Sequence, residues 1–598
     1  MILKNSSYVA LILALLNSSA SAAIRTVALS NQAAAGTPAS AKFGTFTAPL
    51  VDALGRTAFL GQLQTGVGGV NNSSDSGIWS EATGALALVA REGQQAPGAP
   101  ADADFSAFSP ISVNADGELT FNASLVAGAG GVTAANNSGV WSSGNGSLAL
   151  VVRKAQAVER ATSGLNIAIT NSAGLNRGGQ AALRSPIVGG GSGIWKLVNG
   201  AMAPVILSGD QAPGTDTGVT FASFSTVATN LNAAGQTAFR ALLAGPGVSN
   251  DTNGSGIWAE RNNGLALIAR RGNSAPIAGL KFLNIGEPTI NQKGQTAFLA
   301  ALTGPGVTAT NNDALWAEKD NTLALVARAG SQAPLAPIGA NFDTFGDPLF
   351  NGDSDVAFTS TLVGGGLTTA NNDGIWARKD GLLRQVVAEG AEAIGGPTGA
   401  LFQAFSDISL NSAGQVAFSG TLSGGQTTAE SDKGIWAQTL GGVLTLVARE
   451  GQAFEVAPGS TRTISALTLA SGTNEDGRGG AFNDRGEVAF MASFTDGSSG
   501  VFVSDAAKSS PGDFDGDLDV DGADFLVWQR GSGILGGGHP GNGDANYDGN
   551  VNGADLDVWK TKFAVAPATV ATASVPEPGA MTLLAWLIPA ACRARRRR

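Results

Sequence analysis

Tryptophan recurs along the body of the chain at intervals of 54 to 63 residues, and this repeat limits what the chain can fold into. Most copies lie in Gly-Ile-Trp or a close variant, and Phe502 is an eighth aromatic residue at this place. The tryptophans are Trp79, Trp141, Trp195, Trp258, Trp316, Trp376 and Trp436. Chains with such a period stack one supersecondary unit against the next, because no unit can bury its apolar face alone.

A second signature, NxxGxxAF, precedes each of these aromatic residues. Clear copies occupy residues 232–239, 291–298, 411–418 and 483–490, and looser copies occupy 52–59, 114–121, 176–183 and 351–358. Its Asn and Gly are typical of a turn that leads into a strand. Residues 203–260 then contain four short strands, APVILSG, FASFSTVAT, GQTAFRALL and SGIWAE, with one layer of aromatic side chains. Four such strands in about 60 residues predict one blade of a β-propeller.

The count of strands predicts how the array ends. The strand of the LALVAREGQ type occurs at Leu86, Leu148, Ala203, Leu265, Leu323, Leu383 and Leu444. An eighth copy stands at the N-terminus, where residues 26–37 read like residues 205–215. We therefore predict an all-β body over residues 23–505, a closed β-propeller of about eight four-stranded blades in which residues 26–31 pair with the last blade. An open β-solenoid and two smaller propellers are the alternatives.

The two signatures resemble the NxxGxxAF tandem-repeat family of secreted, surface-sorted bacterial proteins. The resemblance covers most of the chain. It implies a location outside the cell and implies no activity, since that family has no established one.

Two segments near the C-terminus, residues 512–528 and 543–559, carry Asp or Asn at positions 1, 3, 5, 7, 9 and 12 of a twelve-residue loop. This is the ligand spacing of an EF-hand-type calcium loop. The six carboxylates of the first loop would repel one another without a divalent cation among them. We predict two calcium ions, held by Asp513, Asp515, Asp517, Asp519, Asp521 and Asp524 in the first loop and by Asp544, Asn546, Asp548, Asn550, Asn552 and Asp555 in the second.

The loops depart from the EF-hand pattern in two ways. Leu518 stands at position 6 of the first loop, where Gly549 supplies the usual glycine in the second. Asp524 and Asp555, rather than Glu, close the loops. Position 7 usually contributes its backbone carbonyl, so Asp519 and Asn550 are placed by geometry rather than by side chain. We expect the first site to be the weaker one.

The pair of loops resembles a dockerin module over residues 512–563, after a linker at residues 506–511. DFLVWQRG and DLDVWKTKF fit the short helix that follows each loop, and the first helix should end at Gly531. The resemblance implies docking to a cohesin-like module, usually within assemblies that degrade polysaccharides. A thrombospondin-type calcium repeat is disfavoured by the helix after position 12, and a calcium clip that only stiffens the chain stays open.

Both ends of the chain predict export. Residues 1–22 have one Lys, an apolar run and Ala20-Ser21-Ala22, which is typical of a secretory signal peptide. After an Ala/Thr/Pro spacer at residues 564–575, residues 576–598 combine Pro-Glu-Pro, a short apolar run and an Arg cluster. This tail resembles the PEP-CTERM sorting signal, which implies transient membrane contact and removal by an exosortase-type enzyme at a bacterial surface. A short permanent anchor is the alternative.

Charge and composition exclude several function classes. The net charge of −11 becomes −17 without Lys4 and the five tail arginines, which argues against a nucleic-acid partner. The only His, His539, lies between the calcium loops, and the only Cys lies in the tail. Ser-His and Cys-His nucleophile systems are therefore excluded from the body. A carboxylate pair acting on a sugar remains, with these candidates: Glu92, Glu260, Glu287, Glu318, Glu389, Glu450 and Glu487.

None of these glutamates breaks the repeat, so we predict no catalytic residue. Glu260 and Glu318 follow the Trp at the same place in two units and are typical of a solvated strand end. The recurrent Arg of VAR either packs the aliphatic part of its side chain on the blade with the guanidinium in water, or joins a ring of guanidinium groups that binds an anion. Packing on the blade is favoured. Loops 304–316 and 364–376 could rim a glycan or cation site, but an Asx-capped turn is favoured.

The sequence thus predicts a secreted, surface-displayed, non-catalytic binding or structural protein. Its propeller would serve as the displayed body or would recognise a ligand such as a glycan, and its dockerin-like module would dock to a cohesin-like partner. A polysaccharide-active enzyme with a carboxylate-based site in the propeller is the alternative.

Overall fold

The computed structural model describes residues 23–563, except 145, 159–164, 167–173, 177, 188–189, 199–200, 226–229, 262–263 and 474–478. The predicted signal peptide (1–22), spacer (564–575) and sorting tail (576–598) lie outside the described residues. None of the helices in the described part combines the length and the apolar character needed to cross a bilayer.

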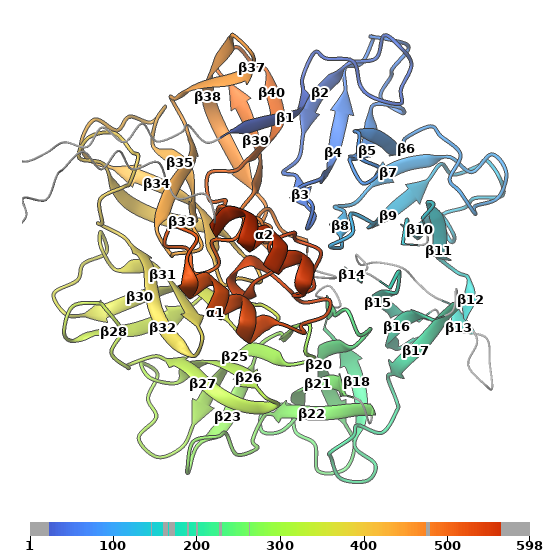
Figure 1. The fold of residues 1–598 in the computed structure, drawn as a ribbon. Helices are drawn as coiled ribbons and strands as arrows, with labels where there is room; N and C mark the ends of the chain where they lie inside the picture. Colours follow the sequence, from blue (N-terminus) through green and yellow to red (C-terminus); the bar gives the residue numbers. More distant parts are fainter. Residues whose placement is uncertain are drawn as a thin grey trace, which may run out of the picture.

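Eight sheets, the blades, surround one centre (Figure 1). Blade 1 comprises β2 (Phe43–Phe46), β3 (Leu50–Val51), β4 (Thr57–Leu63), β5 (Ser76–Ser80) and β6 (Ala87–Arg91). Blade 2 comprises β7 (Phe105–Phe108), β8 (Ser112–Val113), β9 (Leu119–Leu125), β10 (Ser138–Ser142) and β11 (Ala149–Arg153). Blade 3 comprises β14 (Gly174–Leu175), β15 (Ala181–Pro186), β16 (Ser192–Val198) and β17 (Ala201–Leu207). Blade 4 comprises β18 (Thr220–Phe224), β19 (Asn230–Leu231), β20 (Thr237–Ala244), β21 (Ser255–Arg261) and β22 (Gly264–Arg270).

The second half of the ring repeats this order. Blade 5 comprises β23 (Lys281–Ile285), β24 (Thr289–Ile290), β25 (Thr296–Thr303), β26 (Asp313–Lys319) and β27 (Thr322–Arg328). Blade 6 comprises β28 (Ala340–Phe345), β29 (Leu349–Phe350), β30 (Val356–Gly364), β31 (Asp373–Lys379) and β32 (Leu382–Ala388). Blade 7 comprises β33 (Leu401–Leu410), β34 (Val416–Ser423), β35 (Lys433–Gln438) and β36 (Leu444–Arg449). Blade 8 comprises β37 (Ala453–Ala457), β38 (Ser460–Leu469), β39 (Val488–Phe494), β40 (Ser499–Ser504) and β1 (Ile24–Leu29).

A separate two-stranded pair, β12 (Ala157–Val158) and β13 (Leu165–Asn166), lies between blades 2 and 3 in the chain. The predicted number of eight blades is confirmed. Among the described residues, named strands of neighbouring blades share no sheet, so the blades are distinct sheets rather than one continuous ladder.

The two sequence signatures meet inside each blade. The Phe of NxxGxxAF is the cross-strand partner of the following Trp, as in Phe59 with Trp79 and Phe418 with Trp436. The Phe59 and Trp79 rings stack at 6.4 Å, and Phe43 from the first strand meets the edge of Trp79 at 5.0 Å. All seven repeat tryptophans are fully buried. The predicted aromatic layer is present in the described residues of every blade except blade 3, where Leu183 stands opposite Trp195, and it packs the strands through offset and edge contacts.

The predicted boundary of the unit was wrong by one strand. In the sequence, residues 203–260 look like one unit, but β17 pairs with β16 and completes blade 3. Blade 4 instead ends with β22, which pairs with β21. Each blade therefore takes its last strand from the start of what the sequence shows as the next unit.

This offset leaves a gap in the last blade, which β1 fills. β1 pairs antiparallel with β40, with Leu29 opposite Gly500. Leu29 and Ala28 are buried, and the Thr26 hydroxyl donates to the carbonyl of Val456 at 2.7 Å. On its other edge blade 8 carries β37, so it has five strands rather than the predicted four.

The Asn that begins seven of the eight signatures joins neighbouring blades. Asn291 is representative: its Oδ1 accepts from the backbone N–H groups of Lys293 and Gln295 and so closes its own turn. Its Nδ2 donates to the backbone carbonyl of Asn351 in the next blade at 3.0 Å. Asn residues of this ring form the same bond from blade to blade, at 2.9 to 3.1 Å, at these positions: Asn114, Asn176, Asn232, Asn291, Asn351, Asn411 and Asn483.

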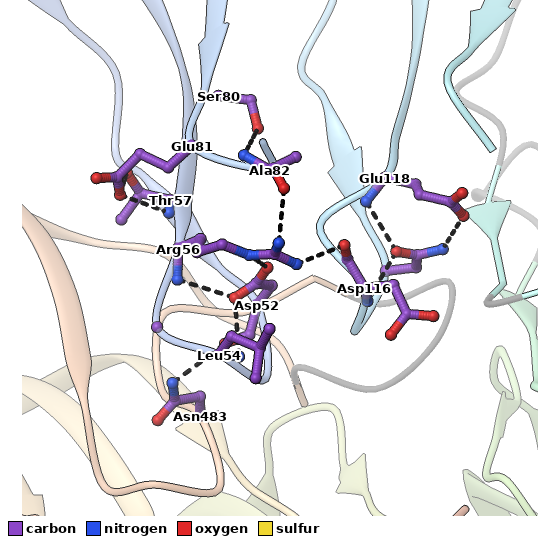
Figure 2. A network of polar contacts seen from close by, with 12 residues as sticks. Asp52, Leu54, Arg56, Thr57, Ser80, Glu81, Ala82, Asp116, Glu118 and Asn483 are labelled. Atoms are coloured by element: carbon purple, nitrogen blue, oxygen red, sulfur yellow. Dashed lines mark hydrogen bonds and ion pairs between the residues drawn. The ribbon is translucent and has the colours of Figure 1, made fainter. Parts of the chain in front are cut away.

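The ring meets its exception between blades 1 and 2 (Figure 2). Asn483 donates to the carbonyl of Asp52 at 3.1 Å, but Asp52 stands where Asn would be and its carboxylate has no N–H to donate onward. Arg56 supplies the missing donors: its Nε bonds the Asp52 carboxylate, and its Nη2 bonds the carbonyl of Asp116 in blade 2 at 2.7 Å.

Truncation just past Gly36 tests the role of β1. The change removes the strand that pairs with β40 and leaves the edge of β40 without a partner, which favours aggregation. We expect the melting temperature of the truncated chain to fall by about 10 °C, since buried Ala28 and Leu29 and a strand ladder are lost together. Calorimetry and light scattering measure this, and an unchanged melting temperature with a monomeric state would show that the ring does not depend on β1.

Candidate calcium-binding module

The C-terminal module contains two loops, each followed by a helix. α1 spans Gly522–Gly531 and α2 spans Gly553–Phe563, with a short 3-10 turn, η1 (Pro540–Asn542), between them. α1 ends at Gly531, as the sequence predicts. Asp521 caps α1 by accepting from the N–H of Ala523, and Asn552 accepts from Ala554 in the same way before α2. Position 9 of each loop is thus engaged as a helix cap, which the spacing alone did not show.

The two halves of the module are related by an approximate internal symmetry. The indole N–H of Trp528 in α1 donates to the carbonyl of Asn552 in the second loop at 2.9 Å. Reciprocally, Trp559 in α2 donates to the carbonyl of Asp521 in the first loop at 3.0 Å. Phe525 packs against both tryptophans, which explains why Trp stands at the same offset after each loop.

The closing aspartate fastens the two ends of each loop. In the first loop Asp524 Oδ1 accepts from the N–H of Phe514 at 2.6 Å, and its Oδ2 accepts from the N–H of Asp521. In the second loop Asp555 bonds Ala545 and Asn552 in the same pattern. Both aspartates are fully buried. The shorter Asp therefore serves at position 12 because it holds backbone N–H groups on both sides of the loop.

Position 1 of each loop carries the feature that best fits a cation. Asp513 and Asp544 are each 1% exposed. One oxygen of each accepts from a backbone N–H of its own loop, whereas Asp513 Oδ2 and Asp544 Oδ1 are buried and accept no hydrogen bond from the described residues. A buried carboxylate oxygen without a donor is costly unless a cation or proton meets it.

The electrostatics of the loops agree with this geometry. Burial, reinforced by neighbouring carboxylates, raises the pKa of Asp513 and of Asp544 to about 6, against the lowering effect of backbone N–H groups. In the first loop, carboxylate oxygens of Asp513, Asp515 and Asp517 lie within 4.8 Å of one another, and those of Asp519, Asp521 and Asp524 do the same. In the second loop, Asn546 replaces one carboxylate and its Nδ2 donates to Asp548 at 3.1 Å. In the first loop the predicted ligands therefore form two groups of three carboxylates, and in the second loop Asn546 and Asp548 are in contact.

Positions 4 and 6 of both loops have left-handed backbone, and the two loops place their glycines differently. Gly516 and Tyr547 at position 4 have φ of 81° and 62°. Leu518 and Gly549 at position 6 both have φ of 80°. Leu518 therefore adopts the turn that glycine provides in the second loop, at a cost of about 1 kcal/mol.

Leu518→Gly should relieve this cost. The Leu518 side chain is 82% exposed, so its removal loses little packing. We expect the calcium affinity of the first loop to rise about fivefold, which corresponds to about 1 kcal/mol, as measured by calorimetric titration. The reciprocal Gly549→Ala should weaken the second loop by a similar factor. Opposite signs in either variant would mean that position 6 does not control these loops.

In the propeller, the glutamates after Trp are not solvated strand ends, and that prediction was wrong. Glu318 is buried and accepts from both the N–H and the hydroxyl of Thr296 at 2.7 Å. Arg261 of the preceding blade donates to it at 2.7 Å. Lys196 and Glu260 form the same kind of ion pair between blades 3 and 4. These carboxylates join blades, and the sequence missed this because the partner cation comes from another repeat.

A second set of glutamates supports the loops. Glu389 is buried and accepts from the N–H groups of Asn372 and Asp373 at 2.9 and 3.0 Å. Beside this set, the recurrent VAR arginines donate through Nε to loop carbonyls, as Arg328 does to Asn311. The Asn311 Oδ1 accepts from the N–H of Thr308 at 2.7 Å, so the favoured Asx-capped turn is what this loop forms.

Glu92 occupies the same place in blade 1, but its carboxylate accepts a longer hydrogen bond, from the N–H of Ser76 at 3.3 Å. Burial raises its pKa from 4.5 to about 7, and nearby Asp75 raises it further, while the N–H of Ser76 lowers it. Between pH 4.5 and about 7 the folded chain binds more protons at Glu92 than the unfolded chain does. The free energy of unfolding therefore falls as the pH rises through this range to about 7. We expect Glu92→Gln to raise the melting temperature by about 3 °C at pH 8 and to leave it unchanged at pH 4.

The matched control is Glu389→Gln, which weakens two charge-assisted hydrogen bonds and should give no gain at pH 8. Calorimetry at both pH values decides the matter, and a gain of equal size at pH 4 would exclude ionisation as the cause.

Comparison of the chain with known proteins found matches among solved structures and one matching family model. No curated protein matches it. Among solved structures it is similar to the β-propeller domain of the trilobed protease from Pyrococcus furiosus, at 10% identity over 69% of this chain and 100% of that one, with a TM-score of 0.33. A prolyl endopeptidase matches at 10% identity over 76% of this chain and 55% of its own, with a TM-score of 0.35. A protein of unknown function from Dyadobacter fermentans matches at 9% identity over 59% of this chain and 98% of its own, with a TM-score of 0.23.

Similarity at this level says nothing of what the present chain binds or does. The model of one protein family, described as "Family of unknown function (DUF7453)", matches residues 4–159 and 126–508, which include the whole propeller. The chain therefore belongs to this family.

Proposed function

We propose that this is a secreted, surface-displayed bacterial protein without catalytic activity, whose C-terminal module binds two calcium ions and docks to a cohesin-like partner. The observation that carries the proposal is the buried oxygen at position 1 of each loop, Asp513 Oδ2 and Asp544 Oδ1, which has no donor among the described residues. When bound, calcium would supply the positive charge that these oxygens and their acidic neighbours need. Asp515 and Asp517 in the first loop, and Asn546 and Asp548 in the second, would complete the ligand sets.

The exposed faces of the module's helices support docking. Leu526 on α1 is 49% exposed and Phe563 at the end of α2 is 51% exposed. Phe563 stacks on Trp559 at 4.7 Å, and Trp559 contacts Phe525 of α1, the neighbour of Leu526, so aromatic side chains link the two helices. Exposed apolar surface of this kind is typical of a protein-binding site. We assign this surface to the cohesin-like partner, within an assembly linked to polysaccharide degradation.

The propeller supports a display or recognition role rather than catalysis. The glutamates that the sequence offered as acids or bases hold structural positions: Glu260 and Glu318 pair with cations of the preceding blade, and Glu389 caps a loop. The signal peptide and the tail at residues 576–598 carry the proposed location, with removal by an exosortase-type enzyme after transient membrane contact. A glycan is the proposed class of propeller ligand.

Calcium titration of the full chain, followed by partner capture, tests the proposal. We expect two sites in the wild-type chain and one after Asp544→Ala with Asp548→Ala, since the second loop loses two ligands. Capture from the native cell surface should require calcium and should be lost in Leu526→Asp with Phe563→Ser, while both calcium sites remain. Two sites without calcium-dependent capture would contradict docking, and no calcium binding at all would contradict the module's assignment.

A further inference from the structure

The C-terminal module is in contact with the propeller. α1 and α2 lie over the centre of the ring (Figure 1). The linker from Asp505 at the end of blade 8 to Asp513 at the start of the first loop is short, which keeps the module next to the blade that precedes it. The contacts between the two parts show which surface of each is used.

Two turns of the NxxGxxAF signature make the polar contacts. His539 Nε2 lies 2.8 Å from Asp353 Oδ2 in blade 6, and the His539 side chain is 7% exposed. The guanidinium of Arg485 in blade 8 lies over the ring of Tyr547, 4.9 Å from its centre. Asp353 and Arg485 hold the same place in the signature, the third residue of the turn. The module is therefore seated on the face where the turns of the Asn ring lie.

Blade 7, which lies between blades 6 and 8, adds a backbone contact with the module. Gly441 and Gly516 approach so closely that a Cβ on either would collide with the backbone of the other. A Cβ on Gly541 would lie 3.4 Å from the Leu440 side chain, which is itself buried. Contacts with three successive blades fix the module's orientation and not only its position.

Arg485 connects the module to the seam between the last and first blades of the ring. Besides stacking on Tyr547, Arg485 donates through Nη1 to the carbonyl of Leu54 in blade 1 at 3.2 Å. This bond crosses the seam between the last and first blades, beside the bond from Asn483 to Asp52. Tyr547 is position 4 of the second calcium loop and has left-handed backbone, so ordering of that loop fixes where its ring stands.

We propose that the module is a calcium-dependent clamp on its own propeller, which holds the seam between blades 8 and 1 through Tyr547 and Arg485 and is seated by His539 on Asp353. This inference rests on the proposed calcium binding and goes beyond it, because it assigns the partner of the module's loop face. The loop face engages the propeller, and the helix face stays open for an outside partner. Calcium that orders the second loop then stabilises the ring, since binding to the folded state alone raises its stability.

The test uses the full chain and measures calcium binding and propeller melting separately. We expect saturating calcium to raise the melting temperature of the propeller by about 5 °C or more. Asp353→Ala, which lies outside the calcium loops, should reduce this shift by at least half and leave two calcium sites in the titration. Asp116→Ala changes the same turn position in blade 2 and is the matched control, with an undiminished shift.

A second variant keeps the result interpretable. Tyr547→Gly removes the ring and keeps the left-handed backbone, as Gly516 does at the same position of the first loop. It should also reduce the calcium-induced shift by at least half. If calcium fills two sites and neither variant changes the shift, the clamp is refuted and the calcium module stands. If calcium does not bind, both ideas fail together.

Discussion

The carboxamide of the signature asparagine is the interaction on which the fold depends, because both of its ends are used. Its oxygen closes the turn before the central strand, and its N–H group reaches the backbone of the next blade, as in Asn291 with Asn351. These side chains are almost entirely buried, so each hydrogen bond is made away from water, where leaving it unmade is expensive. Neither Asp nor Ala can do both. The ring of blades is therefore joined by one residue type in seven of its eight blades.

The contacts within one repeat could be predicted from the sequence, whereas the contacts between neighbouring repeats could not. The turn, the Phe–Trp layer and the number of blades follow from local pattern and period, since these contacts join residues close in the chain. The bond from Asn411 to Asn483 and the pair of Arg261 with Glu318 join different repeats, so no local spacing points to them. Glu318 was misread for the same reason: its cation is 57 residues away.

The calcium loops show the same division. The positions of the twelve candidate ligands were read from spacing, and the structure shows two groups of three carboxylates in the first loop and a contact of Asn546 with Asp548 in the second. Spacing did not reveal that Asp521 and Asn552 cap the helices, or that Leu518 takes a left-handed backbone. Both depend on backbone geometry, which follows from how the loop ends are fastened by Asp524 and Asp555. Function therefore had to be argued from the buried oxygens at position 1 rather than from the count of acids.

Blade 1 differs from the other seven blades, and the module contacts the seam beside it. Seven blades pass an Asn N–H group to the next blade, but blade 1 has Asp52 in that place and depends on Arg56 to continue the chain of bonds. The carboxylate of Asp52 is buried, and burial raises its pKa even though Arg56 lowers it, so this junction has a charge to accommodate that the others lack. Arg485 crosses the same seam and meets Tyr547. Asn483 and Arg485 thus both donate across the seam between the last and first blades, and Tyr547 of the second calcium loop packs on Arg485 there, on the face where the signature turns lie.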